Sequence, residues 1–148
     1  MPTHAEKQVV PYRPDQLFEL VADVGRYPEF LPWCVAARVR SRTEAELVAD
    51  LTIGFGPFRE SFTSRVTLDR ARLTILVEYL DGPFSRMQNR WTFRQTSEIS
   101  SDVEFFIDYE FRSRTFAMLA GAVFDTVFRR MAAAFEKRAD QVYGRKLA

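Results

Sequence analysis

The chain of 148 residues is long enough to bury one hydrophobic core, so we expect a single domain over residues 1–148. Hydrophobic residues make up 47% and aromatic residues 14% of the chain, and this composition excludes a disordered protein. The formal net charge of +1 provides no bulk field that would attract nucleic acid, and we therefore expect no DNA partner.

The N-terminal part of the chain predicts one strand and two short helices. Residues 5–10 have the pattern of a short strand, which Pro11 ends. Pro14 suits the first position of a helix over residues 14–23. The next stretch, residues 26–33 (RYPEFLPW), predicts a short helical turn between prolines.

The middle of the chain, residues 34–112, changes to a period of two. Apolar and polar side chains alternate, and turn signals such as Gly-Pro and Asp-Gly-Pro interrupt the alternation. Such a pattern is typical of an antiparallel meander with one apolar and one polar face. The six predicted strands cover residues 35–40, 46–53, 58–68, 73–79, 87–94 and 102–111.

The C-terminal stretch, residues 115–143, predicts one long amphipathic helix, because apolar residues recur at helical spacing and no proline interrupts them. Ser113 can cap its N-terminus. Up to residue 128 the only ionisable group is Asp125, so we expect protein or an apolar space around this half. Charged residues return from Arg129 onward, and they predict a second half on the surface.

This order of elements predicts an α+β helix-grip fold, in which a curved antiparallel sheet wraps around a long C-terminal helix. A curved sheet and a single helix leave a gap that commonly becomes an elongated apolar cavity. Inward-facing strand residues and the first half of the helix should line that cavity. The predicted lining residues are Phe62, Val66, Ile75, Tyr79, Asn89, Trp91, Phe93, Phe105, Ile107, Phe116, Ala120, Val123, Phe124 and Val127.

Polar residues on the inward rows of the strands are candidates for contacts with a ligand. A carboxylate on an apolar face is unfavourable unless it is paired or protonated. On one interpretation, Glu60 reaches water or an arginine at the end of its strand. On the other interpretation, Glu60, Asn89 and Tyr79 hydrogen-bond the polar head group of a ligand inside the cavity.

Aromatic residues near glycine–proline turns suggest where such a cavity opens. Alternate loops of a meander share one end of the sheet, so the loops after residues 53 and 79 should lie beside the start of the long helix. Exposed rings flanked by arginines suit a membrane interface, whereas the alternative is that the rings only close the core. The predicted entrance residues are Phe55, Phe58, Phe84, Arg59, Arg86, Arg112 and Arg114.

The sequence offers little for catalysis. The sole histidine, His4, lies in the N-terminal tail, and with a single cysteine, Cys34, we expect no metal site, disulfide or catalytic triad. Cys34 should be a buried, inert thiol rather than a reactive one. We find no phosphate-binding loop and no apolar run near the ~20 residues that span a bilayer, and we expect no signal peptide.

Five segments of the chain resemble a known superfamily: residues 17–34 (LFELVADVGRYPEFLPWC), 48–55 (VADLTIGF), 60–66 (ESFTSRV), 81–93 (DGPFSRMQNRWTF) and 105–113 (FFIDYEFRS). Together they resemble the START-like, polyketide-cyclase-like superfamily, and within it the coenzyme Q-binding protein family. The resemblance covers nearly the whole chain.

That resemblance implies a START/Bet v 1-like lipid-binding domain without a cofactor, whose bound ligand is ubiquinone or a related prenylquinone. It implies a carrier or chaperone that supports respiratory electron transport, in the cytoplasm and in peripheral contact with the inner membrane. A close subgroup is a bacterial toxin that binds the large ribosomal subunit and blocks subunit association. The superfamily's cyclase relatives keep a cyclase- or dehydrase-like enzyme open as a third interpretation.

On the ribosomal interpretation, rows of arginine on the polar face of the sheet would meet rRNA phosphate. The candidate residues are Arg38, Arg40, Arg90 and Arg94. Such a row can equally be a solvated surface.

Overall fold

The structure is a computed structural model that describes residues 3–143 except residues 56 and 57. The side chains of Phe55 and Phe58, both predicted at the entrance, also lie outside the described part. The elements are β1 (Thr3–Val10), α1 (Pro14–Ala22), the 3₁₀ helix η1 (Val24–Glu29), β2 (Cys34–Arg42), β3 (Glu46–Phe55), β4 (Phe58–Asp69), β5 (Thr74–Asp81), β6 (Phe84–Ser97), β7 (Ser100–Phe111) and α2 (Arg114–Tyr143).

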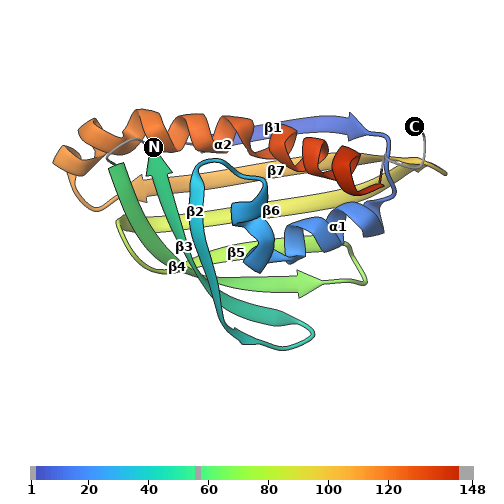
Figure 1. Ribbon diagram of the computed structural model, residues 1–148, viewed down its shortest axis with the longest axis horizontal. Helices are drawn as coiled ribbons and strands as arrows, with labels where there is room; N and C mark the ends of the chain where they lie inside the picture. The colour runs from blue at the N-terminus through green and yellow to red at the C-terminus, as the bar shows by residue number, and fades with distance from the viewer. Residues whose placement is uncertain (1–2, 56–57, 144–148) are drawn as a thin grey trace.

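The described strands form one seven-stranded antiparallel sheet in the order β1-β7-β6-β5-β4-β3-β2. Strands β2 to β7 pair in sequence order as a meander, and β1 adds to the free edge of β7. The sheet bends so that β2 to β4 run across the direction of β5 to β7, while α2 lies along the side of β1 and β7 (Figure 1). The predicted α+β helix-grip fold is confirmed.

The turn between β5 and β6 shows why strand β6 begins earlier than predicted. Gly82 has a φ of 142°, a backbone conformation that residues other than glycine rarely adopt. A Cβ atom there would lie 2.6 Å from the Cβ of Phe62. The turn therefore packs directly against β4 and carries the chain inward, so that pairing with β7 begins at Phe84.

Helix α2 begins with the predicted cap, since the Phe116 N–H donates a hydrogen bond to Ser113 Oγ at 3.2 Å. Its buried stripe follows helical spacing and consists of Ala120, Phe124, Val127, Phe128, Ala132, Phe135 and Ala139. The expectation that the first half is enclosed is wrong at Met118 and Leu119, which are 86% and 75% exposed. Within the described residues, only one side of these first turns packs against the sheet.

Candidate functional site

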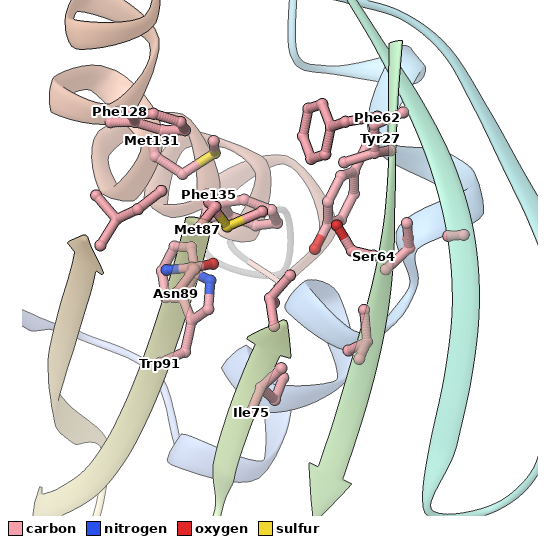
Figure 2. Close-up of a pocket in the computed structure, with 16 residues that line it drawn as sticks. Tyr27, Phe62, Ser64, Ile75, Met87, Asn89, Trp91, Phe128, Met131 and Phe135 are labelled. Atoms are coloured by element: carbon pink, nitrogen blue, oxygen red, sulfur yellow. The ribbon is translucent and has the colours of Figure 1, made fainter. Parts of the chain in front are cut away.

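A cavity of about 70 Å³ lies between the concave face of the sheet and the second half of α2. Its wall is mostly aliphatic, aromatic and methionine side chains, and they surround the open space in Figure 2. The lining residues are Val24, Tyr27, Ala49, Leu51, Phe62, Ser64, Val66, Ile75, Val77, Met87, Asn89, Trp91, Ile107, Phe128, Met131 and Phe135.

The floor of the cavity is made by the inward-facing positions of β4, β5 and β6. Because strand side chains alternate between faces, every second residue points at the cavity. The register places Val77 directly between Val66 on β4 and Asn89 on β6. Asn89 therefore sits in the middle of an apolar row rather than at the rim of the sheet.

The roof of the cavity comes from the middle of α2, where Phe128, Met131 and Phe135 line it. The ring of Phe135 lies 5.2 Å from that of Trp91 on β6, and also 5.2 Å from that of Tyr27 on η1. Burial raises the pKa of Tyr27, whose hydroxyl donates a hydrogen bond to the Val21 carbonyl. Tyr27 therefore lines the cavity as a neutral group, and its hydroxyl already makes a hydrogen bond to the protein backbone.

The structure brings together only part of the predicted lining. Phe62, Val66, Ile75, Asn89, Trp91 and Ile107 line the cavity, whereas Tyr79 and Phe105 do not. Phe93 faces a separate void of about 10 Å³ near α1. The predicted helix residues, Phe116, Ala120, Val123, Phe124 and Val127, also lie away from the cavity, which is covered farther along α2.

An aromatic cluster explains why the first half of α2 does not cover a cavity. Phe84 is 0% exposed, so its predicted place at an exposed entrance is wrong, and the alternative that the ring closes the core is correct. The aromatic rings around Phe84 fill the space where the sequence predicted a cavity. Their ring centroids lie 5.3–6.0 Å from that of Phe84: Phe62, Tyr79, Tyr109, Phe111 and Phe124.

Two of the predicted entrance arginines, Arg86 and Arg112, make contacts with other described residues. Arg86 pairs with Asp108 and Glu110 at 3.1 Å each, and its hydrogen bond to Asp108 raises the pKa of Arg86 and lowers that of Asp108. Arg112 Nε donates to the Phe84 carbonyl at 3.0 Å. Arg59 and Arg114 are exposed.

The polar head-group candidates have different fates. The Tyr79 hydroxyl accepts a hydrogen bond from the Phe84 N–H at 3.2 Å, and Glu60 is half-buried and does not line the cavity. Asn89 does line it, and its Nδ2 donates to the Phe106 carbonyl at 2.8 Å.

Sequence reasoning missed Ser64 as a polar candidate, although the alternation on β4 put it on the inward row of Phe62. Ser64 is 3% exposed, and its hydroxyl has no hydrogen-bond partner among the described residues. The missing hydrogen-bond partner of this hydroxyl depends on which residues surround it in space, and the sequence does not give that.

The chemistry available at the cavity is limited. No carboxylate, imidazole, ammonium or guanidinium group lines it among the described residues. In the same residues, no group of three His, Cys, Asp or Glu side chains could hold a metal ion. Burial raises the pKa of the Cys34 thiol to about 11, so the thiol stays protonated near neutral pH. The arrangement suits binding of a neutral, mainly apolar molecule.

The arginines of the ribosomal interpretation lie on the outer face of the sheet. Arg40 pairs with Asp50 at 2.7 Å and Arg94 with Asp102 at 3.8 Å. Arg90 lies over the ring of Phe106, 5.4 Å from its centroid, and Arg38 is exposed.

No described helix is long and apolar enough to cross a membrane.

Comparison with protein families and curated proteins shows what this chain is similar to. The profile of the family described as polyketide cyclase / dehydrase and lipid transport matches residues 10–136. The ribosome association toxin RatA of Escherichia coli is 33% identical, over 97% of this chain and 90% of the toxin. The coenzyme Q-binding protein COQ10 homolog B of Xenopus laevis, a mitochondrial protein, is 31% identical, over 97% of this chain and 60% of its own length.

Solved structures agree on the architecture. The solution structure of the 18 kDa protein CC1736 from Caulobacter crescentus is 40% identical with a TM-score of 0.75, and the match covers 97% of this chain and 99% of that one. The Zhui aromatase/cyclase from Streptomyces sp. R1128 has a TM-score of 0.81 at 19% identity, and covers 95% of this chain and 94% of its own. At that identity the likeness shows the fold alone.

Proposed function

Because this chain belongs to the family of polyketide cyclases, dehydrases and lipid-transport proteins, we propose that it is a non-enzymatic carrier or chaperone for ubiquinone or a polyprenylated quinone precursor. The ligand's ring occupies the cavity between the sheet and α2. Supporting respiratory electron transport is the role that follows for such a carrier.

The observation that carries this proposal is the composition of the cavity wall. It is apolar except for a few hydrogen-bonding groups, and it contains no ionisable acid or base other than a tyrosine among the described residues. Ligand pockets of this kind bind apolar molecules and use a few polar atoms for orientation. A cyclase or dehydrase would need an acid or base at the reacting atom, and this wall supplies no carboxylate or imidazole for that role.

Ligand binding requires the cavity to widen. Pockets for small molecules measure about 300–1,000 Å³, whereas this cavity measures about 70 Å³. Met87 on β6 and Met131 on α2 both line the cavity. Methionine side chains are unbranched and change rotamer readily, so they can move aside without displacing the backbone.

Peripheral membrane contact is part of the proposal and is assigned to the start of α2. Met118 and Leu119 are exposed there, close in sequence to the exposed Arg112 and Arg114. Apolar side chains beside guanidinium groups suit the boundary between acyl chains and lipid phosphate. Each basic side chain near an anionic surface contributes about 1 kcal/mol.

The test is organic extraction of the purified protein followed by mass spectrometry. We expect a near-stoichiometric prenylquinone or prenylated phenol in the wild type. Ala49→Leu fills the cavity and should lose the ligand, whereas Ala132→Leu, an equally buried alanine outside the cavity, should keep it. An empty wild-type protein, or ligand retained in Ala49→Leu, would refute the proposal.

A second function, binding to the large ribosomal subunit, is favoured by the similarity to the RatA toxin over almost the full length of both chains. Exposed arginine on the outer face of the sheet, such as Arg38, would contact rRNA phosphate. Co-sedimentation with separated ribosomal subunits tests it. Binding of ligand-free protein to large subunits, weakened by Arg38→Glu and by salt, would support this function instead of the carrier.

A further inference from the structure

We infer that the cavity selects a ring that carries a hydroxyl group, a hydroquinone or prenylated phenol, over the corresponding oxidised quinone. The inference rests on the proposed function and sharpens it, because it states which chemical form of the ligand the site binds. Two polar side chains on the cavity wall, Asn89 and Ser64, carry the argument.

The orientation of the Asn89 amide is set by its neighbour. The Phe106 carbonyl can only accept a hydrogen bond, so the amide atom that faces it at 2.8 Å is Nδ2. The amide oxygen, Oδ1, is therefore turned to the other side, toward the open space of the cavity (Figure 2). Asn89 is only 9% exposed, and the one hydrogen bond that its side chain makes among the described residues uses Nδ2 and leaves Oδ1 free. This oxygen can accept a hydrogen bond from a donor on the ligand.

The second polar group is the Ser64 hydroxyl on the opposite wall, which has no hydrogen-bond partner among the described residues. Ser64 lies on β4 and Asn89 on β6, with β5 between them, so their strands are about 10 Å apart at the usual spacing. Figure 2 shows the two side chains on opposite sides of the open space. A hydroxyl can donate or accept, so Ser64 is compatible with either oxidation state of a ligand. Asn89 is the group that discriminates.

The two polar atoms match a ring that has oxygen at each end. A quinone carries only acceptors: it can accept from Ser64, but its other carbonyl would face the Asn89 oxygen, which is also an acceptor. A hydroquinone or phenol donates a hydrogen bond to Asn89 Oδ1, so two acceptor oxygens do not face each other in the cavity. A carboxylate is disfavoured further, because no cationic side chain of the described residues lines the cavity.

The experiment measures binding of matched ligand pairs to the full-length protein by isothermal titration calorimetry. The first pair is a short-chain prenylated hydroquinone and its quinone, kept under nitrogen. The second pair is a short-chain prenylated phenol and the analogue in which methyl replaces the hydroxyl, so that size is unchanged. We expect the hydroxyl-bearing member of each pair to bind about tenfold more tightly, the effect of one buried hydrogen bond.

Two variants connect that preference to the side chains. Asn89→Leu keeps the size of the residue and should bring the members of each pair to within about twofold, because it removes the acceptor. Ser64→Ala should weaken the hydroquinone and the quinone alike, because both have an oxygen opposite Ser64, and it should keep the preference in both pairs. If Asn89→Leu does not fold, the wild-type comparison still decides the inference.

The outcomes distinguish failure of the proposed carrier function from failure of the inferred preference for a hydroxyl group. If none of the four ligands binds, the proposed function is overturned. If they bind but the quinone and the methyl analogue bind as tightly as their hydroxyl partners, the carrier function stands and this inference is wrong. A preference that survives Asn89→Leu would also overturn it, since another group would then supply the acceptor.

Discussion

The interior along α2 contains two neighbouring regions built from similar residues, one solid and one hollow. Around Phe84, aromatic rings meet at centroid distances of 5.3–6.0 Å and fill the space. Around Asn89, the wall includes the small side chains of Ala49 and Ser64 and two flexible methionines, and a cavity of about 70 Å³ remains. Interlocked rings fix a shape, whereas small and unbranched side chains leave space that can change.

The hollow region is covered by the more firmly anchored half of α2. Polar contacts tie this half to β1, to the turn before α1 and to η1: Gln8 to Glu136 at 2.5 Å, Tyr12 to Asp140 at 2.5 Å, and Arg138 to Glu29 at 2.8 Å. The hydrogen bond to Asp140 raises the pKa of Tyr12 to about 12, so the Tyr12 donor is present across the neutral range. Widening of the cavity should therefore come from side chains rather than from displacement of the helix.

The largest effect is expected in the solid region. Phe84→Ala removes a fully buried ring from the centre of the cluster and should lower the free energy of unfolding by about 3–5 kcal/mol. Urea denaturation followed by circular dichroism measures the loss. Phe106→Ala, a half-buried ring on the outer face, is the control and should cost less. A loss below about 1 kcal/mol at Phe84 would mean that the cluster is not close-packed.

The contrast between filled and hollow space can be tested with matched alanines. Ala132→Leu inserts atoms where the adjacent void measures only about 10 Å³, so it should destabilise the protein by about 1–3 kcal/mol. Ala49→Leu inserts the same atoms beside the larger cavity and should change stability much less. Equal losses in urea denaturation at the two positions would contradict the presence of usable space near Ala49.

A smaller difference is expected between two buried serines. Ser101 Oγ donates to the Tyr12 carbonyl at 2.6 Å, so Ser101→Ala should cost about 1 kcal/mol. The Ser64 hydroxyl has no partner in the described chain, so Ser64→Ala should leave the ligand-free protein equally stable or more stable. Thermal unfolding of the two variants side by side measures this. A comparable loss at Ser64 would show that its hydroxyl is already satisfied.

The smallest effect on stability is expected at the exposed start of α2, next to the solid region. Met118→Ser/Leu119→Ser should change the free energy of unfolding by less than about 0.5 kcal/mol per site. The same double variant should lose flotation with anionic vesicles. Ile99→Ser is the control, because Ile99 is 72% exposed in the turn between β6 and β7, at the opposite end of the molecule (Figure 1). Unchanged flotation of the double variant would remove this surface as the membrane contact.

The pattern of the sequence was sufficient for the order and type of the elements, because periods of two and of about 3.6 report directly which face is buried. The pattern predicts which face of an element is buried, but not where along that face a cavity lies. The buried stripe of α2 runs through both Phe124 and Phe135, and only packing shows that the first meets rings and the second meets a cavity.

The error at Phe84 has a local cause. A ring next to a glycine–proline turn is expected to be exposed, since turns usually lie on the surface. Here the turn packs against Phe62, with Gly82 in a conformation that requires glycine, and this brings Phe84 inside. Ser64 shows the same limit, because alternation predicts that it points inward while its missing partner depends on neighbours from other strands.

The most direct test of the central claim, that the ligand ring binds between the sheet and α2, uses the two tryptophans. Trp91 lines the cavity and Trp33 does not, so Trp33→Phe leaves a single reporter at the site. Titration of this variant with a short-chain prenylated hydroquinone should produce a saturable change in Trp91 fluorescence, with the same dissociation constant that calorimetry gives. Binding detected by calorimetry without any change at Trp91 would place the ligand elsewhere and contradict the account.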